Sequence, residues 1–168
     1  MINDQSSKRF KLNYEESIML RSVLAVIGAY ILMFILQVAA FMTIYTLVGA
    51  DWSFKPASYQ ASTRWTVMQF VVIFVTAAIS GLVCALIAKG GKAPLALAVV
   101  VLVLGFALAI LGTALRPADT HEVRTGNVPN MVAMRKAKHP TWVIFLGPVV
   151  AAVGVIIGGK LKRRAPVR

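Results

Sequence analysis

Four long apolar stretches, separated by shorter polar segments, dominate the pattern of hydrophobic and polar positions along the chain. They cover about residues 23–49, 65–88, 93–115 and 142–159, and none of them contains Asp, Glu, Lys, Arg or His. A membrane-spanning helix needs about 20 consecutive apolar residues, so each stretch is long enough to cross a bilayer once. The pattern predicts an all-α integral membrane protein with four transmembrane helices in an antiparallel bundle and both termini on the same side.

The first apolar stretch is longer than one crossing requires. Its 27 uncharged residues would make about 40 Å of helix, so we expect tilt or an extension beyond the lipid. It is also too long for a cleaved signal peptide, so we expect it to be retained. Residues 1–21 precede it as a polar segment in which Phe10, Tyr14 and Ile18 recur every four residues. That spacing favours a short helix lying among the headgroups, with an unstructured tail as the alternative.

The connections between the apolar stretches differ in length. Within a transmembrane domain at residues 22–160, the segments 50–64 and 116–141 are long outer loops, and a basic tail follows at 161–168. The turn at residues 89–92 (KGGK) is minimal, and Pro94 suits the first turn of a helix. We therefore expect the second and third helices to be antiparallel neighbours.

The flanking charges indicate an orientation. The side that holds the termini carries eleven Lys and Arg residues, and the opposite side carries seven. Positive residues favour the cytoplasmic side, so the termini are predicted to be cytoplasmic. Trp52, Trp65 and Trp142 all fall at the face opposite the termini, as an interfacial aromatic belt requires.

Composition excludes several classes of protein. Hydrophobic residues make up 58% of the chain, well above the share in a soluble domain. A single cysteine, Cys84, permits no intrachain disulfide and no cysteine-rich metal site. The net charge of +12 is divided among the flanks of apolar segments, so we expect it to meet anionic lipid headgroups rather than nucleic acid.

Small residues lie on one face of three of the predicted helices. They are Gly147, Ala151, Gly154 and Gly158 in the fourth, Ala77, Gly81 and Ala85 in the second, and Gly105, Ala109 and Gly112 in the third. Small residues let helix backbones approach closely, which drives helix association in lipid. The contact could be made within one bundle, in a homo-oligomer or with another membrane protein.

A basic cluster ends the fourth helix, at Lys160, Lys162, Arg163 and Arg164. Positive charge there meets the negative end of the helix dipole and the anionic lipid surface. We interpret these residues as lipid-headgroup contacts and as a topology signal.

Polar groups inside the predicted spans are few. Gln37 lies near the middle of the first span, and Thr76 and Ser80 lie near the middle of the second. Because water is absent at that depth, we expect hydrogen bonds between helices, or alternatively a small polar path. Coupled transporters usually keep an ionisable group inside the membrane, and the four stretches have none.

The 116–141 loop holds the few residues that could bind a metal. Asp119, His121 and Glu122 lie together, and His139 follows at the end of the loop. Such side chains can ligate a metal, but no HExxH or second ligand cluster accompanies them. A solvated loop without metal or cofactor is our interpretation, and a metal-dependent enzyme is the alternative.

The segment His139-Pro140-Thr141-Trp142, followed by an apolar span that ends Gly158-Gly159-Lys160-Leu161, resembles a group of small uncharacterised bacterial membrane proteins with four predicted spans. The resemblance covers the second half of the chain and loosely includes residues 77–88. It implies a bacterial inner membrane and no particular activity.

By elimination, the sequence predicts a non-enzymatic structural, accessory or assembly component of a membrane complex. The alternatives are a small transporter or channel-like oligomer with a polar path near Gln37, Thr76 and Ser80, and the metal-dependent enzyme.

Overall fold

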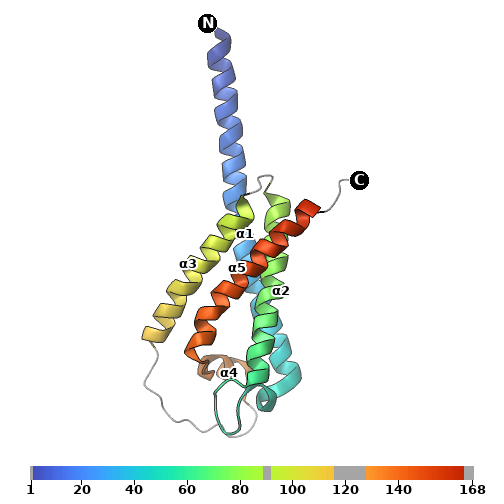
Figure 1. Cartoon of the computed structure of the whole chain (residues 1–168), viewed down its shortest axis with the longest axis vertical. Coiled ribbons are helices and arrows are strands. Elements are labelled where there is room, and N and C mark those ends of the chain that lie inside the picture. The colour runs from blue at the N-terminus through green and yellow to red at the C-terminus, as the bar shows by residue number, and fades with distance from the viewer. Residues whose placement is uncertain (1, 89–91, 116–127, 165–168) are drawn as a thin grey trace.

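The computed structural model describes residues 2–88, 92–115 and 128–164. These contain the helices α1 (Ile2–Ser53), α2 (Thr63–Ile87), α3 (Ala93–Ala114), α4 (Asn130–Lys136) and α5 (Thr141–Arg164). The four long helices are apolar enough to cross a membrane. They form an antiparallel bundle in which α1 begins and α5 ends on the same side (Figure 1). The predicted all-α four-span fold with both termini on one side is thereby confirmed.

The four long helices form a ring. α2 lies between α1 and α5, and α3 closes the ring by packing against α5 and α1. We predicted α2 and α3 to be antiparallel neighbours, and they are antiparallel and in contact (Figure 1), although α5 packs more extensively against each of them. The reason is that α5 presents small residues to α2 and fits against it more closely than α3 does. The turn at residues 89–91 lies outside the described residues.

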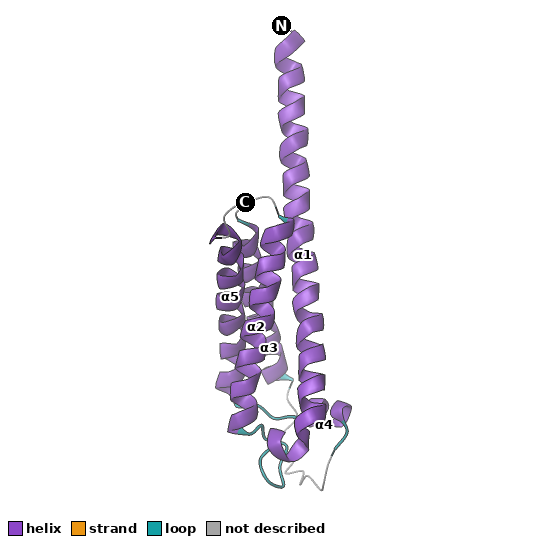
Figure 2. Cartoon of the chain, turned by 90° about the vertical axis from the view of Figure 1, so that its right-hand side faces the viewer, coloured by secondary structure: helices purple, strands orange, loops and turns teal. Residues whose placement is uncertain are grey.

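Helix α1 is much longer than the bundle. Its 52 residues correspond to about 78 Å of helix, more than twice the hydrocarbon core of a bilayer. The N-terminal extension, residues 2–21, continues in line with the span and stands clear of the other helices (Figures 1 and 2). We expected a separate headgroup helix or a tail. No Gly or Pro precedes Gly28, so nothing in the sequence interrupts the helix at residue 22.

The other end of α1 has a definite kink. Gly49 has a φ of 75° and a ψ of −180°, a conformation that glycine adopts without steric cost. One helical turn follows, in which the Ser53 hydroxyl donates to the Gly49 carbonyl at 2.8 Å. The residues after the kink, Ala50, Ser53 and Phe54, are buried.

Helices α2 and α5 pack backbone against backbone. A Cβ atom added to Gly158 would collide with the backbone carbonyl of Ala78, and one added to Gly81 would collide with that of Val155. A Cβ on Gly154 would lie 2.8 Å from the carbonyl oxygen of Phe74. The Cα hydrogens that occupy these directions point at the carbonyls, in the geometry of weak C–H···O hydrogen bonds.

The remaining small residues differ in how closely other helices approach them. Ala77, Ala85, Ala109 and Ala151 are buried. A Cβ on Gly105 of α3 would lie 2.6 Å from Cγ of Pro148 in α5, so this glycine makes room for the proline ring. Gly147 has only the end of the Ile73 side chain within 4 Å of its Cβ position, and Gly112 has nothing.

The polar residues of the spans differ from expectation. The Thr76 hydroxyl donates to the carbonyls of Val72 at 2.8 Å and Ile73 at 3.2 Å, both in its own helix. The predicted interhelical hydrogen bond of Thr76 is therefore wrong, because a threonine hydroxyl reaches the carbonyl one turn earlier. Ser80 is fully buried, and its hydroxyl has no partner among the described residues. Gln37 is half-buried.

Lys162 makes a defined contact inside the protein. Its ammonium donates to the carbonyl of Ala85 at 2.6 Å, one of the last four carbonyls of α2, which lack a partner within the helix. The charge also lies at the negative end of the α2 dipole. Lys160 is exposed, and Arg163 and Arg164 belong to the last turn of α5.

Candidate ligand pocket in the cap

The two long connections join into an ordered cap at the end of the bundle opposite the termini. This cap consists of residues 53–62, α4 and residues 137–139. The Ala61 amide donates to the Lys138 carbonyl at 3.0 Å, and the Lys138 amide donates to the Tyr59 carbonyl at 2.9 Å. The segments predicted as two separate loops therefore form one unit.

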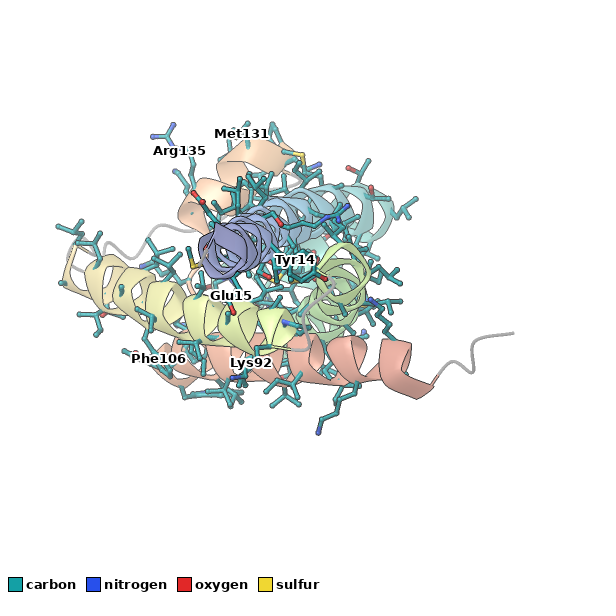
Figure 3. The ribbon with its side chains drawn as sticks, turned by 90° about the horizontal axis from the view of Figure 1, so that it is seen from above. Tyr14, Glu15, Lys92, Phe106, Met131 and Arg135 are labelled. Atoms are coloured by element: carbon teal, nitrogen blue, oxygen red, sulfur yellow. The ribbon has the colours of Figure 1, made fainter. Side chains whose placement is uncertain are left out.

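The cap packs on α1 and α2 through a small hydrophobic core. Tyr45, Ala50, Phe54 and Ala133 are buried together, and Trp65 packs against them. Two polar contacts fix this core to α1. The Tyr45 hydroxyl donates to the Val128 carbonyl at 2.8 Å, and the Asn130 side-chain amide donates to the Thr46 hydroxyl at 2.8 Å. Seen from above, α4 lies on one side of α1, with Met131 and Arg135 pointing away from the bundle (Figure 3).

A cavity of about 170 Å³ lies between the cap, α1 and α2. Its lining residues are Phe41, Tyr45, Phe54, Trp65, Gln69, Asn130, Ala133, Ala137 and His139. We call it the cap pocket. Its volume is close to that of a cavity that binds one benzene molecule, about 150 Å³. The pocket therefore has room for a single small ring.

Aromatic rings form the wall of the cap pocket. The centre of the Trp65 ring lies 6.2 Å from that of Tyr45, with the planes at 89°, and 6.1 Å from that of Phe41. Tyr45 also meets Phe54 edge to face, at 6.3 Å. Aromatic pairs at these distances attract each other beyond simple burial. Together with the tyrosine hydroxyl contact, they hold the wall in one arrangement.

Gln69 is the polar feature that packing does not explain. It belongs to α2, it lines the cap pocket, and its side-chain oxygen is buried without a hydrogen-bond partner among the described residues. Leaving a buried acceptor unpaired costs about 1–3 kcal/mol. The amide therefore favours any molecule in the pocket that brings it a hydrogen bond.

The structure brings together some of the residues singled out from the sequence. His139 lines the cap pocket, whereas Asp119, His121 and Glu122 lie outside the described residues. Within residues 2–88, 92–115 and 128–164, no three His, Cys, Asp or Glu side chains could jointly hold a metal ion.

The three tryptophans all lie near the cap. Trp52 meets Trp65 edge to face at 6.4 Å, and Trp142 packs on Phe70 at 6.0 Å. Trp65 thus contributes both to the predicted belt and to the cap pocket.

The sequence-based reasoning missed Gln69 and Asn130. The sequence does contain one indication for Gln69, because its polar amide lies four residues into an apolar stretch. The sequence contains no such indication for Asn130, because its hydrogen bond to Thr46 depends on where α4 packs against α1.

The fold and the pocket together define an all-α, multi-pass membrane protein with an ordered cap at one end. No known protein family, curated protein or solved structure matches the chain. The resemblance to small bacterial four-span proteins therefore stays a prediction.

Proposed function

We propose that the chain is a non-enzymatic accessory component of a membrane complex, and that it binds a partner membrane protein through α1. The observation that supports this most directly is how little of α1 its own bundle covers. Within the most apolar window of each span, 17% of residues are buried in α1 and 22% in α3, against 44% in α2 and 39% in α5. The least covered helix is also the one that continues beyond the bundle.

An apolar groove of about 830 Å³ runs between α1 and α3. Ile27 and Ile31 of α1 and Leu104 of α3 line its deeper part, and Ser22 and Lys92 lie at the end nearer the termini. The occupant that we propose is a transmembrane helix of the partner. A helix seated there could follow α1 out of the membrane along the N-terminal extension, whereas a lipid chain could not.

The extension itself favours a protein partner. Tyr14, Met19 and Leu20 are each at least 60% exposed, although they are large apolar side chains near the water boundary. Burying each of them would contribute about 1.5–3 kcal/mol. The extension stands clear of the other described helices (Figures 1 and 2), so packing against a partner would stabilise the exposed side chains and with them the helix.

The proposed orientation places both termini in the cytoplasm of a bacterial cell. Its support is the excess of Lys and Arg on the side of the termini. The partner would then meet the N-terminal extension in the cytoplasm.

A polar path through the bundle has less support. The Thr76 hydroxyl bonds to its own helix, and the Ser80 hydroxyl, although without a partner among the described residues, is fully buried, so a solute can reach neither of them. The candidate metal ligands of the enzyme alternative lie mostly outside the described residues.

Site-specific photocrosslinking in cells tests the partner. A photoreactive residue at Ile31, in the groove, should yield a discrete protein adduct. The same residue at Val71, which is exposed on α2, should yield only lipid adducts or none. Deleting residues 2–13 should reduce recovery of the adduct partner while the remaining chain still folds. Equal crosslinking at both positions, or a chain recovered only as a partner-free monomer, contradicts the proposal.

A further inference from the structure

The cap pocket combines three properties that together describe a ligand. Its walls are aromatic, its volume of about 170 Å³ suits one ring, and the Gln69 amide oxygen lining it has no partner among the described residues. Binding sites for small molecules are typically apolar hollows with few polar groups that fix orientation. The cap pocket has this composition at a place distinct from the α1–α3 groove.

The lining of the cap pocket favours a neutral ligand. None of the nine lining residues is Asp, Glu, Lys or Arg, so the pocket has no fixed counter-charge for an ion. Moving an ion out of water into a pocket without a counter-charge costs much more than moving a neutral molecule.

The Gln69 amide selects the polar group of the ligand. A hydroxyl can donate to the amide oxygen, and by rotating it can accept from the amide nitrogen instead. It therefore satisfies the side chain whichever of the two amide atoms faces the pocket. A ketone or an ether could not donate to the oxygen.

We propose that the cap pocket binds a neutral aromatic ring that carries a hydroxyl group, a phenol or a hydroquinone. The ring packs against Trp65 and Tyr45, and the hydroxyl donates to Gln69. The pocket lies at the level of the tryptophan belt, so such a ring could come from water or could be the head of a lipid-soluble hydroquinone. The chemistry that binds it is the same in both cases.

Fluorine NMR of 4-fluorophenol with the purified full-length chain in lipid nanodiscs tests the proposal. We expect saturable binding, with fluorobenzene at least about ten-fold weaker because it lacks the hydroxyl. Replacement of Gln69 by Leu should remove this preference and leave fluorobenzene unaffected. Gln60→Leu changes an exposed amide of the cap outside the pocket, and it should bind as the unaltered protein does.

A second variant keeps the proposal testable if Gln69→Leu does not fold. Ala137 is half-buried in the pocket wall, so Ala137→Leu should fill the space and abolish binding of both compounds. Unsaturable partitioning, equal binding of the two compounds, or an undiminished preference in Gln69→Leu overturns the proposal. No binding of any phenol would mean that water satisfies Gln69, and would overturn it as well.

A competition experiment distinguishes a ligand that comes from water from one that comes from the membrane. A hydroquinone with an isoprenoid tail, added to the nanodisc lipid, should displace 4-fluorophenol at a low mole fraction if the natural ligand is membrane-borne. Displacement by short hydroquinone in water but not by the tailed compound would assign a water-borne ligand. Neither result depends on whether α1 binds a partner.

Discussion

The contact between α2 and α5 makes the most quantitative prediction, through Gly158→Ala. The added methyl group would overlap the backbone carbonyl of Ala78, which cannot move aside as a flexible side chain can. The helices must therefore separate, and overpacking of this kind costs about 1–3 kcal/mol. Loss of the C–H···O contact that the glycine makes adds about 0.5–1 kcal/mol.

The matched control is Gly112→Ala in α3, where nothing lies within 4 Å of the new methyl group. Alanine is favoured over glycine inside a helix by up to about 1 kcal/mol, so this control should be neutral or slightly stabilised. Because the gain in helix propensity is common to both variants, they should differ by about 1.5–4 kcal/mol, the sum of the two costs at Gly158. For a chain of this size that corresponds to about 3–16 °C in the midpoint of thermal unfolding.

A fluorogenic thiol reagent provides the assay, because the native Cys84 is fully buried in α2. Its thiol should react only when the bundle opens, so fluorescence on heating in one detergent reports the unfolding midpoint. Unfolding of Gly158→Ala at the same temperature as Gly112→Ala would refute the close backbone packing of α2 and α5.

The other predictions concern charge and orientation. Lys162→Met should destabilise the protein by about 1–2 kcal/mol, because the Ala85 carbonyl loses a charged donor. Lys160→Met should have little effect in the same thermal assay, and equal losses would contradict this assignment. In a background lacking the native cysteine, Ser17→Cys should label with an impermeant thiol reagent only from the cytoplasmic side, and Lys55→Cys only from the other. Labelling of both from one side would refute the crossing of the membrane by α1.

Hydrophobic patterning predicted the spans well because lipid imposes a simple requirement. A helix without charges and long enough to cross the core satisfies its own backbone hydrogen bonds, so residues 65–88 and 93–115 correspond closely to α2 and α3. The extent of α1 was harder to predict. Polarity marks where a helix leaves lipid, whereas only a breaking residue or a cap marks where it ends, and residues 1–21 contain no Gly or Pro.

The cap and its pocket depend on contacts that are distant in sequence. Asn130 and Thr46 are 84 positions apart, and Tyr45 and Val128 are 83 apart. No local sequence pattern predicts either hydrogen bond, because polar residues in loops usually bond to water. The stripes of small residues were visible in the sequence, but their partners were not. Only the packed bundle shows that Gly158 faces α2 and Gly105 faces α5.

One continuous helix gives the molecule a mechanical link between the two faces of the membrane. Tyr45 in the cap and Tyr14 in the extension belong to α1, and the kink at Gly49 lies beyond both of them. The rod between these tyrosines is about 46 Å long, so a rotation of about 5° at one end displaces the other by about 4 Å. A tilt of α1 at the cap would therefore displace its far end, and the contacts of Ala29 and Met33 inside the bundle would shift with it.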